Sequence, residues 1–408
     1  MASDHQSGLE WLYGTQLFGI KLGLENVHRL LAALGLPGAG MKFIHVAGTN
    51  GKGSTCAFMH SILREAGIHA GLFTSPHLIR FNERIQDSAR MISDDEIESG
   101  LSRLRALVQD WNPHPTFFEL AFVLALDWFR DRGLEWVILE TGMGGRLDAT
   151  NAVTPAASVI TSIGWDHMEI LGDTLAKIAL EKAGIIKPGV PVVTQAQPDE
   201  VQHVLQAEAA RQSSPFVVVE PWQGDAPGLL GPHQRQNAAL AVHGLRAAGL
   251  RISGAEAERG LASVKWPGRF YRVGPDQGLI IDGAHNLDAV RMLVETWQGE
   301  FPGEKAVVIF GVAGNKDVRA MLRSLAPIVK EWRFTAFRSP RAMPAAALQA
   351  AWQDLEMPPI SVTISGGVAE ALAAPATGRR LVAGSLYLVG EALALLAGDV
   401  GRFQASTQ

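Results

Sequence analysis

The amino-acid sequence predicts an α/β protein of two domains, each built on a mainly parallel sheet with helices on both faces. Short apolar runs alternate with amphipathic stretches along almost the whole chain, which is typical of strand–helix–strand units. The length of 408 residues exceeds that of most single domains. Pro, Gly and Asp cluster at 266–276 between two series of such units. We therefore predict domains at 1–267 and 268–408, the second of them smaller.

The strands of the first series are predicted at 42–47, 68–73, 136–140, 157–163, 191–194 and 216–219. A helix is predicted over 54–66, because apolar residues such as Cys56, Met59 and Leu63 recur at steps of three and four. Gly67 is placed to end that helix. Further helices are predicted at 118–130 and 174–184. The alternating order of strands and helices makes this sheet mainly parallel.

The second series repeats the same alternation after the Trp-Pro-Gly sequence at 266–268. Its strands are predicted at 279–281, 305–310, 331–337 and 380–383. Its helices are predicted at 287–297, 318–329, 345–355 and 386–396. The apolar stretch 381–397 contains Gly384, Ser385 and Glu391, so it is predicted as a buried strand followed by a helix.

The composition excludes several classes of protein. With 47% hydrophobic and 19% charged residues the chain can bury a large core, which excludes disorder or a coiled coil as a description of the whole. The 36 basic and 41 acidic residues give a net charge of −5, whereas a nucleic-acid-binding protein usually carries a basic face. A phosphate ligand stays compatible, because a pocket needs only a few local cations.

Cysteine usage and the N-terminal sequence favour a cytoplasmic protein. Cys56 is the single cysteine, so no intrachain disulfide is expected and the chain fits a reducing compartment. The first residues show no signal-peptide pattern. No uninterrupted apolar run approaches the ~18–20 residues of a membrane span. We expect neither a membrane nor a nucleic acid as a partner.

The first predicted strand runs directly into the sequence AGTNGKGS at 47–54, which a helix follows. Glycines let backbone N–H groups close around phosphate oxygens, the helix N-terminus adds partial positive charge, and Lys52 can reach the outer phosphates. The alternative is an ordinary glycine-rich turn between a strand and a helix. Gly53 occupies the position where a Mg²⁺-binding hydroxyl usually stands. Either Ser54 compensates or another segment supplies that ligand.

Polar residues follow the carboxyl ends of the neighbouring strands, where ligands collect in open parallel sheets. They include Ser75, Glu140 and His167. A hydroxyl, a carboxylate and an imidazole can hold a divalent ion together with substrate phosphates, although His is a less usual ligand of Mg²⁺. Singly, each residue has another explanation: a turn cap, an ion pair or a loop histidine. Their convergence on one edge of one sheet favours a metal site.

Lys182 stands on the apolar stripe of the helix predicted at 174–184. Leu175, Ile178 and Lys182 follow one another at i, i+3 and i+7, and a charge on such a stripe is costly unless it is paired. One explanation is a lysine stem whose ammonium reaches the surface. The other is an amine in a special site, including a chemically modified one.

Ten segments together resemble the folylpolyglutamate synthase/dihydrofolate synthase family, a branch of the Mur ligase superfamily. They are VAGTNGKGS, FTSPHLIRFNERI, TFFE, ILETGMGGRLDATN, SIGWDH, EKAGIIKPG, HQRQNAAL, PGR, DGAHN and GSLYLVGE, in this order over residues 18–395. The resemblance implies an N-terminal P-loop ATPase-like domain and a smaller C-terminal Rossmann-like domain, with ATP between them. This is the Mur ligase architecture.

The same resemblance implies roles for individual residues. For ATP it implies phosphate contacts from Asn50, Gly51, Lys52 and Gly53 with Ser54 beside them, an adenine contact from Asn237, a phosphate contact from Arg269 and a ribose contact from Asp282. It implies two Mg²⁺ sites, one at Ser75 and Glu140 and one at Glu140 and His167, with Lys182 as a carbamylated lysine beside the metal. His285 would lie beside the transferred phosphoryl group. From the residues alone, Asp282 and Asn286 are equally well explained as caps of the helix at 287.

The reaction implied is the ATP-dependent joining of a carboxylate to the amine of L-glutamate through an acyl phosphate. Lys52, Arg269 and Mg²⁺ would neutralise charge on the transferred group. Lys182, near the second metal, would help bring the acceptor carboxylate to the phosphate. His285 would stabilise charge, and its use as a transient phosphate carrier is an alternative. Domain closure would exclude water from the acyl phosphate.

The acceptor is expected to be dihydropteroate as well as (tetrahydro)folate. In bifunctional members of the family a pterin pocket is formed by three segments, and this sequence matches all of them. The matching residues are Leu22, Gly23, Leu24, Glu25, Thr116, Phe118 and Asp148. Phe118 could stack on a pterin and Asp148 could accept from its N–H groups. Taken alone, Phe118 is better explained as the start of the core helix 118–130, whereas the three segments together favour the pterin pocket. A monofunctional folylpolyglutamate synthase is the alternative.

Two further classes remain as rivals. A ligase of the superfamily acting on a nucleotide-linked cell-wall precursor would share Lys52, Glu140, His167 and Lys182, but not the pterin segments. A nucleotide-gated binding protein would not need Arg269, Asp282 and His285 in a second domain. We expect a monomer that takes only small-molecule substrates.

Overall fold

The computed structural model describes residues 6–18, 23–38, 40–274 and 277–404, which form two compact units. Unit 1 comprises Met1–Ser75, Asn82–Asp225 and Gln236–Ser263, and unit 2 comprises Pro76–Phe81, Ala226–Arg235 and Val264–Gln408. Both are α/β units with mainly parallel sheets, so the predicted fold class is confirmed. Each unit takes segments from more than one part of the chain, and the single boundary at 267/268 stays a prediction.

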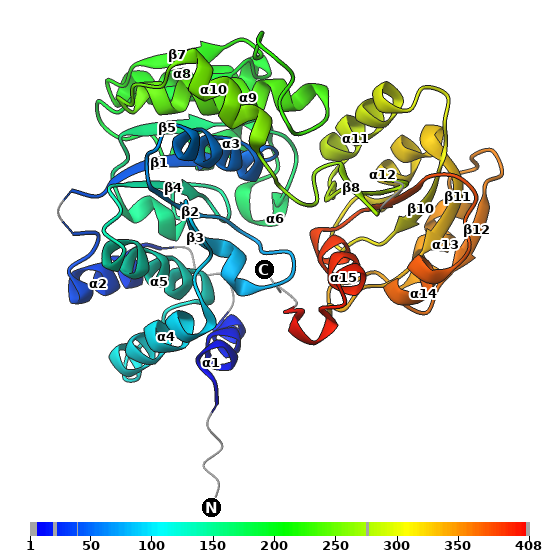
Figure 1. Cartoon of the computed structure of the whole chain (residues 1–408), viewed down its shortest axis with the longest axis horizontal. Coiled ribbons are helices and arrows are strands. Elements are labelled where there is room, and N and C mark those ends of the chain that lie inside the picture. The colour runs from blue at the N-terminus through cyan, green and yellow to red at the C-terminus, as the bar shows by residue number, and fades with distance from the viewer. Residues whose placement is uncertain (1–5, 19–22, 39, 275–276, 405–408) are drawn as a thin grey trace, which may run out of the picture. The chain divides into compact units, whose positions relative to one another are not determined.

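Unit 1 is organised by a sheet of seven strands in the order β3-β2-β4-β1-β5-β6-β7 (Figure 1). The strands are β1 (Lys42–Ala47), β2 (Ala70–Phe73), β3 (Ile85–Asp87), β4 (Trp136–Glu140), β5 (Ala157–Ile160), β6 (Val192–Gln195) and β7 (Phe216–Val219). Among the strands that the structure describes in this sheet, only β3 is antiparallel to its neighbour. The chain passes from β1 towards β2 on one side and from β5 towards β7 on the other. The loop after β1 therefore lies where the strand order reverses, the usual ligand position in such sheets.

Helices cover both faces of this sheet. On one face lie α3 (Lys52–Glu65), α9 (Pro232–Ala247) and α10 (Gly254–Ser263). On the other lie α5 (Phe117–Asp131), α7 (Leu175–Ala183) and α8 (Asp199–Arg211). The outer helices α1 (Gly8–Gly14), α2 (Glu25–Leu34) and α4 (Asp94–Val108) contact α5 or one another, and the short α6 (Met168–Leu171) contacts α7. This enclosure explains why β1, β2, β4 and β5 are almost wholly buried.

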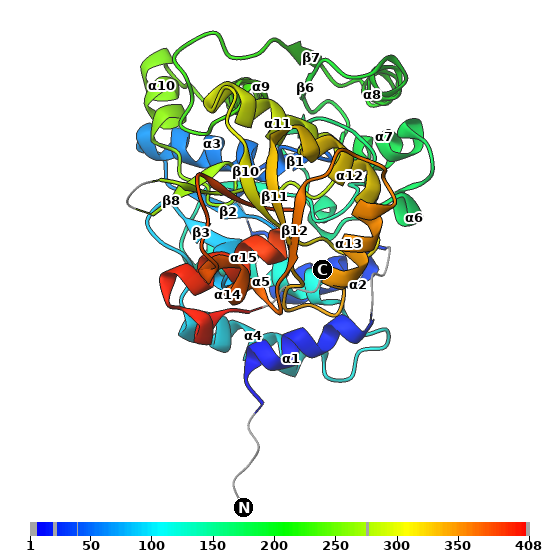
Figure 2. The same ribbon diagram turned by 90° about the vertical axis from the view of Figure 1, so that its right-hand side faces the viewer.

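Unit 2 contains a sheet of six strands in the order β12-β11-β10-β13-β9-β8. These are β8 (Tyr271–Val273), β9 (Leu279–Ile281), β10 (Ala306–Phe310), β11 (Val329–Phe334), β12 (Ser361–Ile364) and β13 (Arg380–Ala383), with β8 antiparallel to β9. The helices α11 (Leu287–Glu300), α12 (Val318–Leu325) and α13 (Ala345–Gln353) pack on one face, and α14 (Val368–Ala373) and α15 (Leu386–Ala397) on the other (Figure 2).

Several predicted boundaries are wrong, each for a local reason. β2 begins at Ala70 rather than at 68, because the Ile68 N–H is used to close the end of α3. β5 ends at Ile160 rather than at 163, since the next residues turn towards the loop after β1. The helix predicted over 318–329 ends at Leu325, and Pro327 lies in the 3₁₀ turn that follows. β11 covers Val329–Phe334 rather than 331–337. Within the described ranges, no helix combines the length and apolarity needed to cross a membrane.

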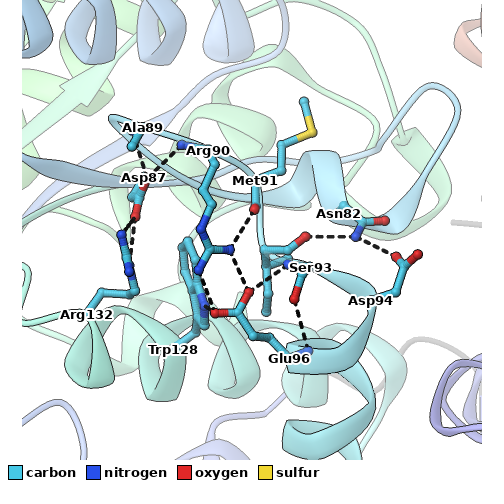
Figure 3. A network of polar contacts seen from close by, with 11 residues as sticks. Asn82, Asp87, Ala89, Arg90, Met91, Ser93, Asp94, Glu96, Trp128 and Arg132 are labelled. Carbon is cyan, nitrogen blue, oxygen red and sulfur yellow. Dashed lines mark hydrogen bonds and ion pairs between the residues drawn. The ribbon is translucent and has the colours of Figure 1, made fainter.

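A polar network joins the start of α4 to α5 and to the β2–β3 hairpin (Figure 3). Ser93 and Glu96 form a capping box at the first turn of α4. The Arg90 guanidinium donates to both Glu96 oxygens at 2.6 and 2.7 Å, and Trp128 Nε1 of α5 donates to Glu96 Oε1 at 2.9 Å. Arg132 pairs with Asp87 of β3. One carboxylate thus caps a helix and ties it to two neighbours.

We predict that Glu96→Ala lowers the free energy of unfolding by about 2 kcal/mol, because it removes a cap and three further hydrogen bonds, two from Arg90 and one from Trp128. Equilibrium denaturation in urea measures this loss. Asp95→Ala is the matched control, since Asp95 is an exposed acidic residue in the same helical turn; it should cost no more than about 0.5 kcal/mol. Equal losses in the two variants would contradict this role of Glu96.

The effect of Glu96 should also depend on pH. Its hydrogen bonds with the Arg90 guanidinium hold the pKa of this carboxyl well below its usual value of 4.5. A depressed carboxyl pKa stabilises the fold above the unfolded-state value and loses that contribution as the pH falls towards the folded-state value. The difference in stability between wild type and Glu96→Ala should therefore narrow as the pH is lowered from about 5 to about 3. A difference that stays constant over this range would contradict the pairing.

Candidate functional site

The loop after β1 is held by the residues that follow β5. The Thr49 N–H donates to the Ser162 carbonyl at 2.7 Å, and the Ser162 hydroxyl donates to the Asn50 carbonyl at 3.2 Å. The Thr49 hydroxyl bonds both the N–H and the carbonyl of Gly164, each at 3.1 Å. The loop therefore keeps its shape through contacts with its own sheet edge.

Two glycines of this loop have no room for a side chain. A Cβ on Gly48 would lie 1.8 Å from the Thr161 hydroxyl, and a Cβ on Gly51 would lie 2.4 Å from Asn237 Oδ1. Gly51 also has a φ of 91°, which favours glycine. The predicted adenine contact Asn237, on α9, therefore stands directly against the predicted phosphate loop.

The helix after the loop begins at Lys52, so Gly53 and Ser54 belong to its first turn and both are buried. Backbone N–H groups of such a first turn lack partners within the helix and can face an anion. This is the arrangement that the sequence predicts for phosphate binding. Ser54 keeps its hydroxyl at this turn, one position after the place where a Mg²⁺-binding hydroxyl usually stands.

Two lysines meet at one carbonyl of the loop. Lys52 Nζ donates to the Gly48 carbonyl at 3.1 Å, and Lys182 Nζ donates to the same carbonyl at 2.8 Å. Lys182 is 4% exposed, so its ammonium does not reach the surface and that alternative is wrong. Burial, and then the nearby charge of Lys52, lowers the pKa of Lys182 to about 7, while Asp166 and Asp148 act in the opposite direction. A large fraction of this amine is therefore neutral near pH 7.

The strand-end residues are brought to the same edge of the sheet. The Ser75 N–H donates to Glu140 Oε2 at 3.0 Å, and Glu140 is 5% exposed. His167 has a φ of 52° and precedes α6, and its N–H donates to Asp166 Oδ1 at 2.9 Å. Among the described residues, no group of three or more His, Cys, Asp and Glu side chains could hold a metal ion. Of the predicted metal ligands, only Glu140 and His167 belong to these four residue types. A metal ion at this edge would therefore also need the Ser75 hydroxyl, a modified Lys182 and the nucleotide as ligands.

The three predicted pterin segments are neighbours in unit 1. The helix α2, which begins at Glu25, contacts both α5 and the 3₁₀ turn Ala149–Ala152 that follows Asp148. Phe118 is half-buried on α5, 5.7 Å from the Phe73 ring, and a Cβ on Gly142 would lie 2.6 Å from it. Leu22 lies outside the described residues, whereas Gly23 and Leu24 are half-buried just before α2.

Thr116 and Asp148 both have structural partners as well. Thr116 caps α5 in a capping box with Glu119, so its side chain has a structural role in starting this helix. Asp148 Oδ1 accepts from the N–H and the hydroxyl of Thr150 at 3.0 and 2.5 Å, and Oδ2 accepts from the Met143 N–H at 2.9 Å. Burial raises the pKa of Asp148, which these hydrogen bonds oppose.

The residues predicted in the second domain lie together in unit 2. Asp282 follows β9 and accepts from the N–H groups of Phe270 and Ala284, both at 2.8 Å. His285 Nδ1 donates to the Gly283 carbonyl at 2.7 Å, and a Cβ on Gly283 would lie 2.5 Å from Arg269 Nη1. Arg269, Asp282 and His285 therefore surround one turn. Asn286 caps α11, as the simpler explanation of that residue predicted.

The contacts of the segment that follows Ser75 were not predicted from the sequence. The segment Pro76–Phe81, directly after Ser75, belongs to unit 2. There Gln404 accepts from His77 Nε2 and the Phe81 N–H and donates to the Ile79 carbonyl, each at 2.8 Å. Gln404 stands near the end of the chain with no sequence motif around it.

Comparison with known protein families finds two matches. The Mur ligase middle domain matches residues 46–220, and the Mur ligase glutamate ligase domain matches residues 268–386. A dihydrofolate synthase/folylpolyglutamate synthase of Bacillus subtilis is 38% identical over 377 residues, which cover 84% of this chain and 87% of the relative.

Solved structures show the same similarity along nearly the whole chain. The Escherichia coli FolC in complex with DHPP and ADP is 30% identical with a TM-score of 0.84, covering 97% of this chain and 98% of the other. The bifunctional folylpolyglutamate synthase/dihydrofolate synthase of Yersinia pestis, complexed with AMPPNP and Mn ion, is 30% identical with a TM-score of 0.85. It covers 96% of this chain and 98% of the other.

We predict that Gly51→Ala weakens the binding of MgATP at least about tenfold. A side chain at position 51 would meet Asn237 and would hold alanine in a left-handed conformation that costs roughly 1–2 kcal/mol. Isothermal titration calorimetry with a non-hydrolysable ATP analogue measures the change.

Gly67→Ala is the matched control for this variant. Gly67 has a φ of 69° but no atom within 4 Å of an added Cβ, and it stands at the opposite end of α3. It should lose stability and keep its affinity for nucleotide. Unchanged nucleotide affinity in Gly51→Ala would show that this loop does not hold the phosphates.

Proposed function

We propose that this chain uses ATP to add L-glutamate to dihydropteroate and to folates. The chain belongs to the dihydrofolate synthase/folylpolyglutamate synthase family of Mur ligases. It is an ATP-dependent ligase that uses a divalent metal. The observation that carries the proposal is the convergence of a phosphate loop, two lysines and the Ser75–Glu140 pair on one edge of the unit 1 sheet. Such an edge can bring phosphates and an activated carboxylate together.

The reaction proceeds in two steps. A carboxylate oxygen of the acceptor attacks the γ-phosphorus of ATP, the bond to the β-phosphate oxygen breaks, and ADP leaves. The amine of glutamate then attacks the acyl carbon of the acyl phosphate, inorganic phosphate leaves with the former carboxylate oxygen, and the amine loses a proton. ATP supplies the activation that a carboxylate, as a poor electrophile, needs.

Side chains of both units supply the charge for these steps in our proposal. Lys52 leaves the Gly48 carbonyl for the outer phosphates, and the first turn of α3 donates backbone N–H groups to them. Arg269 and His285 of unit 2 offset charge on the transferred phosphoryl group. Asn237 binds the adenine and Asp282 the ribose. With Arg269 and His285 in unit 2, domain closure would help to keep water from the acyl phosphate.

The donor set at the sheet edge suits a divalent cation. Ser75, Glu140 and His167 would hold it, and the buried carboxylate of Glu140 would gain a counter-charge. When bound, Mg²⁺ would neutralise phosphate oxygens and draw the acceptor carboxylate towards them. The resemblance implies two Mg²⁺ sites, one of which Glu140 would form with Ser75 and the other with His167.

Lys182 is proposed to be carbamylated. A neutral amine attacks CO₂, a C–N bond forms, and the nitrogen loses one proton to give an anionic carbamate. The surroundings of Lys182 favour this product, because two ammonium groups otherwise compete for one carbonyl in a buried site. The carbamate would replace a buried cation with an anion beside the metal ligands.

Dihydropteroate is included among the acceptors because the three pterin segments pack together. Phe118 presents a half-buried ring beside Gly142, and Asp148 of the neighbouring loop presents a buried carboxylate. By resemblance, these three segments form the pterin pocket of bifunctional members of the family. The boundary at 267/268, the monomeric state and the cytoplasmic location stay predictions from the sequence.

We predict product from both acceptors when the protein is incubated with MgATP and L-glutamate. Dihydropteroate should give dihydrofolate, and tetrahydrofolate should give its glutamyl extension, as resolved by mass spectrometry. Product from tetrahydrofolate alone would remove the dihydrofolate synthase activity from the proposal. ATP hydrolysis stimulated by neither acceptor would remove the ligase activity altogether.

We predict that Lys182→Ala loses at least about 100-fold in ligation, because the variant lacks the anion at the metal site. Wild-type protein equilibrated with ¹³C-bicarbonate should show a carbamate carbon in its NMR spectrum, and Lys182→Ala should not. Lys177→Ala serves as the control, since Lys177 lies on the same helix with an exposed side chain that pairs with Asp173. A wild-type spectrum without the carbamate signal would contradict the modification.

A further inference from the structure

His45 is a fully buried histidine on the central strand β1 that the proposed mechanism does not use. It is 0% exposed, and its Nε2 lies 2.7 Å from the hydroxyl of Thr150, which is also 0% exposed. The Thr150 hydroxyl in turn lies 2.5 Å from Asp148 Oδ1. A buried chain of three side chains therefore leads from the middle of the sheet to the carboxylate proposed to bind the pterin.

The direction of the hydrogen bonds along this chain follows from counting protons. A hydroxyl carries one proton, and Thr150 donates it to the Asp148 carboxylate. Thr150 must then accept from His45, which requires a proton on Nε2. Burial, and then the charge of Lys187, lowers the pKa of His45 to about 3, so the ring is neutral and Nδ1 carries no proton. This agrees with Nδ1, which has no hydrogen-bond partner among the described residues.

The opposite direction is disfavoured by the same count. It would place a proton on Asp148 and a proton on His45 Nδ1, leaving a buried N–H donor without an acceptor. It would also weaken the hydrogen bonds that the N–H groups of Met143 and Thr150 donate to Asp148, because a neutral carboxyl is a poorer acceptor than a carboxylate. The tautomer of His45 thus decides that Asp148 acts as an acceptor.

We propose that His45 is a positioning residue for the acceptor substrate, acting through Thr150 to hold Asp148 as an oriented, hydrogen-bond-accepting carboxylate. This inference rests on the proposed function, in which Asp148 receives the N–H groups of a pterin. Thr150 fills two lone-pair directions of Oδ1 with its N–H and its hydroxyl, and the Met143 N–H fixes Oδ2. The backbone of Gly142 donates to the same carboxylate, so the Asp148 side chain is held in one orientation.

The fold supplies this arrangement from segments far apart in the chain. His45 and Thr150 are separated by 105 positions. On the β1–β5 pair, His45 lies beside Ser158, whose hydroxyl donates to the Ile185 carbonyl at 2.9 Å. The Lys187 ammonium donates to the Asn151 carbonyl at 3.1 Å and so fixes the turn that carries Thr150. A rigid sheet thereby supports a loop that has to bind a ligand in one orientation.

Four variants test the chain without charge changes. Thr150→Val and His45→Leu are close in size to the natural residues and break it. Thr150→Ser keeps the hydroxyl, and His45→Gln keeps an N–H near the position of Nε2. The Michaelis constants for dihydropteroate, ATP and glutamate are measured separately for each variant, and thermal denaturation reports whether each one folds.

The breaking variants should raise the Michaelis constant for dihydropteroate about tenfold, the size of one oriented hydrogen bond. The values for ATP and glutamate should stay within about twofold, and Thr150→Ser and His45→Gln should restore the dihydropteroate value. Three constants that rise together in His45→Leu, or conservative variants that behave like the breaking ones, would show a purely structural role and overturn the proposal.

Asp148→Asn separates this inference from the proposed function. If it raises the Michaelis constant for dihydropteroate while Thr150→Val and His45→Leu do not, Asp148 binds the acceptor without help from His45 and the inference fails alone. If Asp148→Asn leaves that constant unchanged, the pterin assignment in the proposed function fails first. If His45→Leu unfolds at the same temperature as the wild type, its Michaelis constants can be compared directly with those of the wild type. Thr150→Val is a second variant that breaks the same chain of hydrogen bonds.

Discussion

The site depends on how closely the loop after β1 approaches its neighbours. Gly48 stands against the Thr161 hydroxyl with no room for a methyl group, and Gly51 stands against the Asn237 amide in the same way. This close approach lets the Gly48 carbonyl receive both Lys52 and Lys182. Every charge proposed to act on the phosphates in unit 1 is placed relative to this short stretch of backbone.

Burial changes the properties of two charged residues, Lys182 and Asp148. An exposed lysine at position 182 would carry a full positive charge, whereas the buried one has a lowered pKa and stands beside a second lysine. Asp148 is buried as well, but backbone and hydroxyl donors surround its carboxylate. The net charge of −5 says little about the ligands, because a few buried groups decide the local potential.

The sequence was sufficient where a pattern is local. The strands β1, β4, β7, β9 and β13 have the predicted bounds, because each is an apolar run bounded by turn residues. The stripe of α7 also predicted that Lys182 faces the core. The strands β3, β8 and β12 were missed, because they are short edge strands without a continuous apolar run.

Contacts between segments far apart in the chain could not be predicted from the sequence. His45 lies in a run of residues typical of a buried strand, and no sequence pattern near it predicts a hydrogen bond with Thr150. Likewise, the three bonds of Gln404 to the segment after Ser75 join positions more than 320 residues apart. Periodicity predicts which side of an element is buried, whereas hydrogen bonds across a fold depend on register and loop geometry that no local pattern carries.

The most direct test of the proposed chemistry follows the oxygen atoms of the acceptor. Dihydropteroate labelled with ¹⁸O in its carboxylate is incubated with the protein, MgATP and L-glutamate, and the inorganic phosphate is examined by mass spectrometry. An acyl phosphate requires one labelled oxygen in phosphate for each amide bond formed. Amide product accompanied by unlabelled phosphate would contradict activation of the carboxylate by the γ-phosphoryl group.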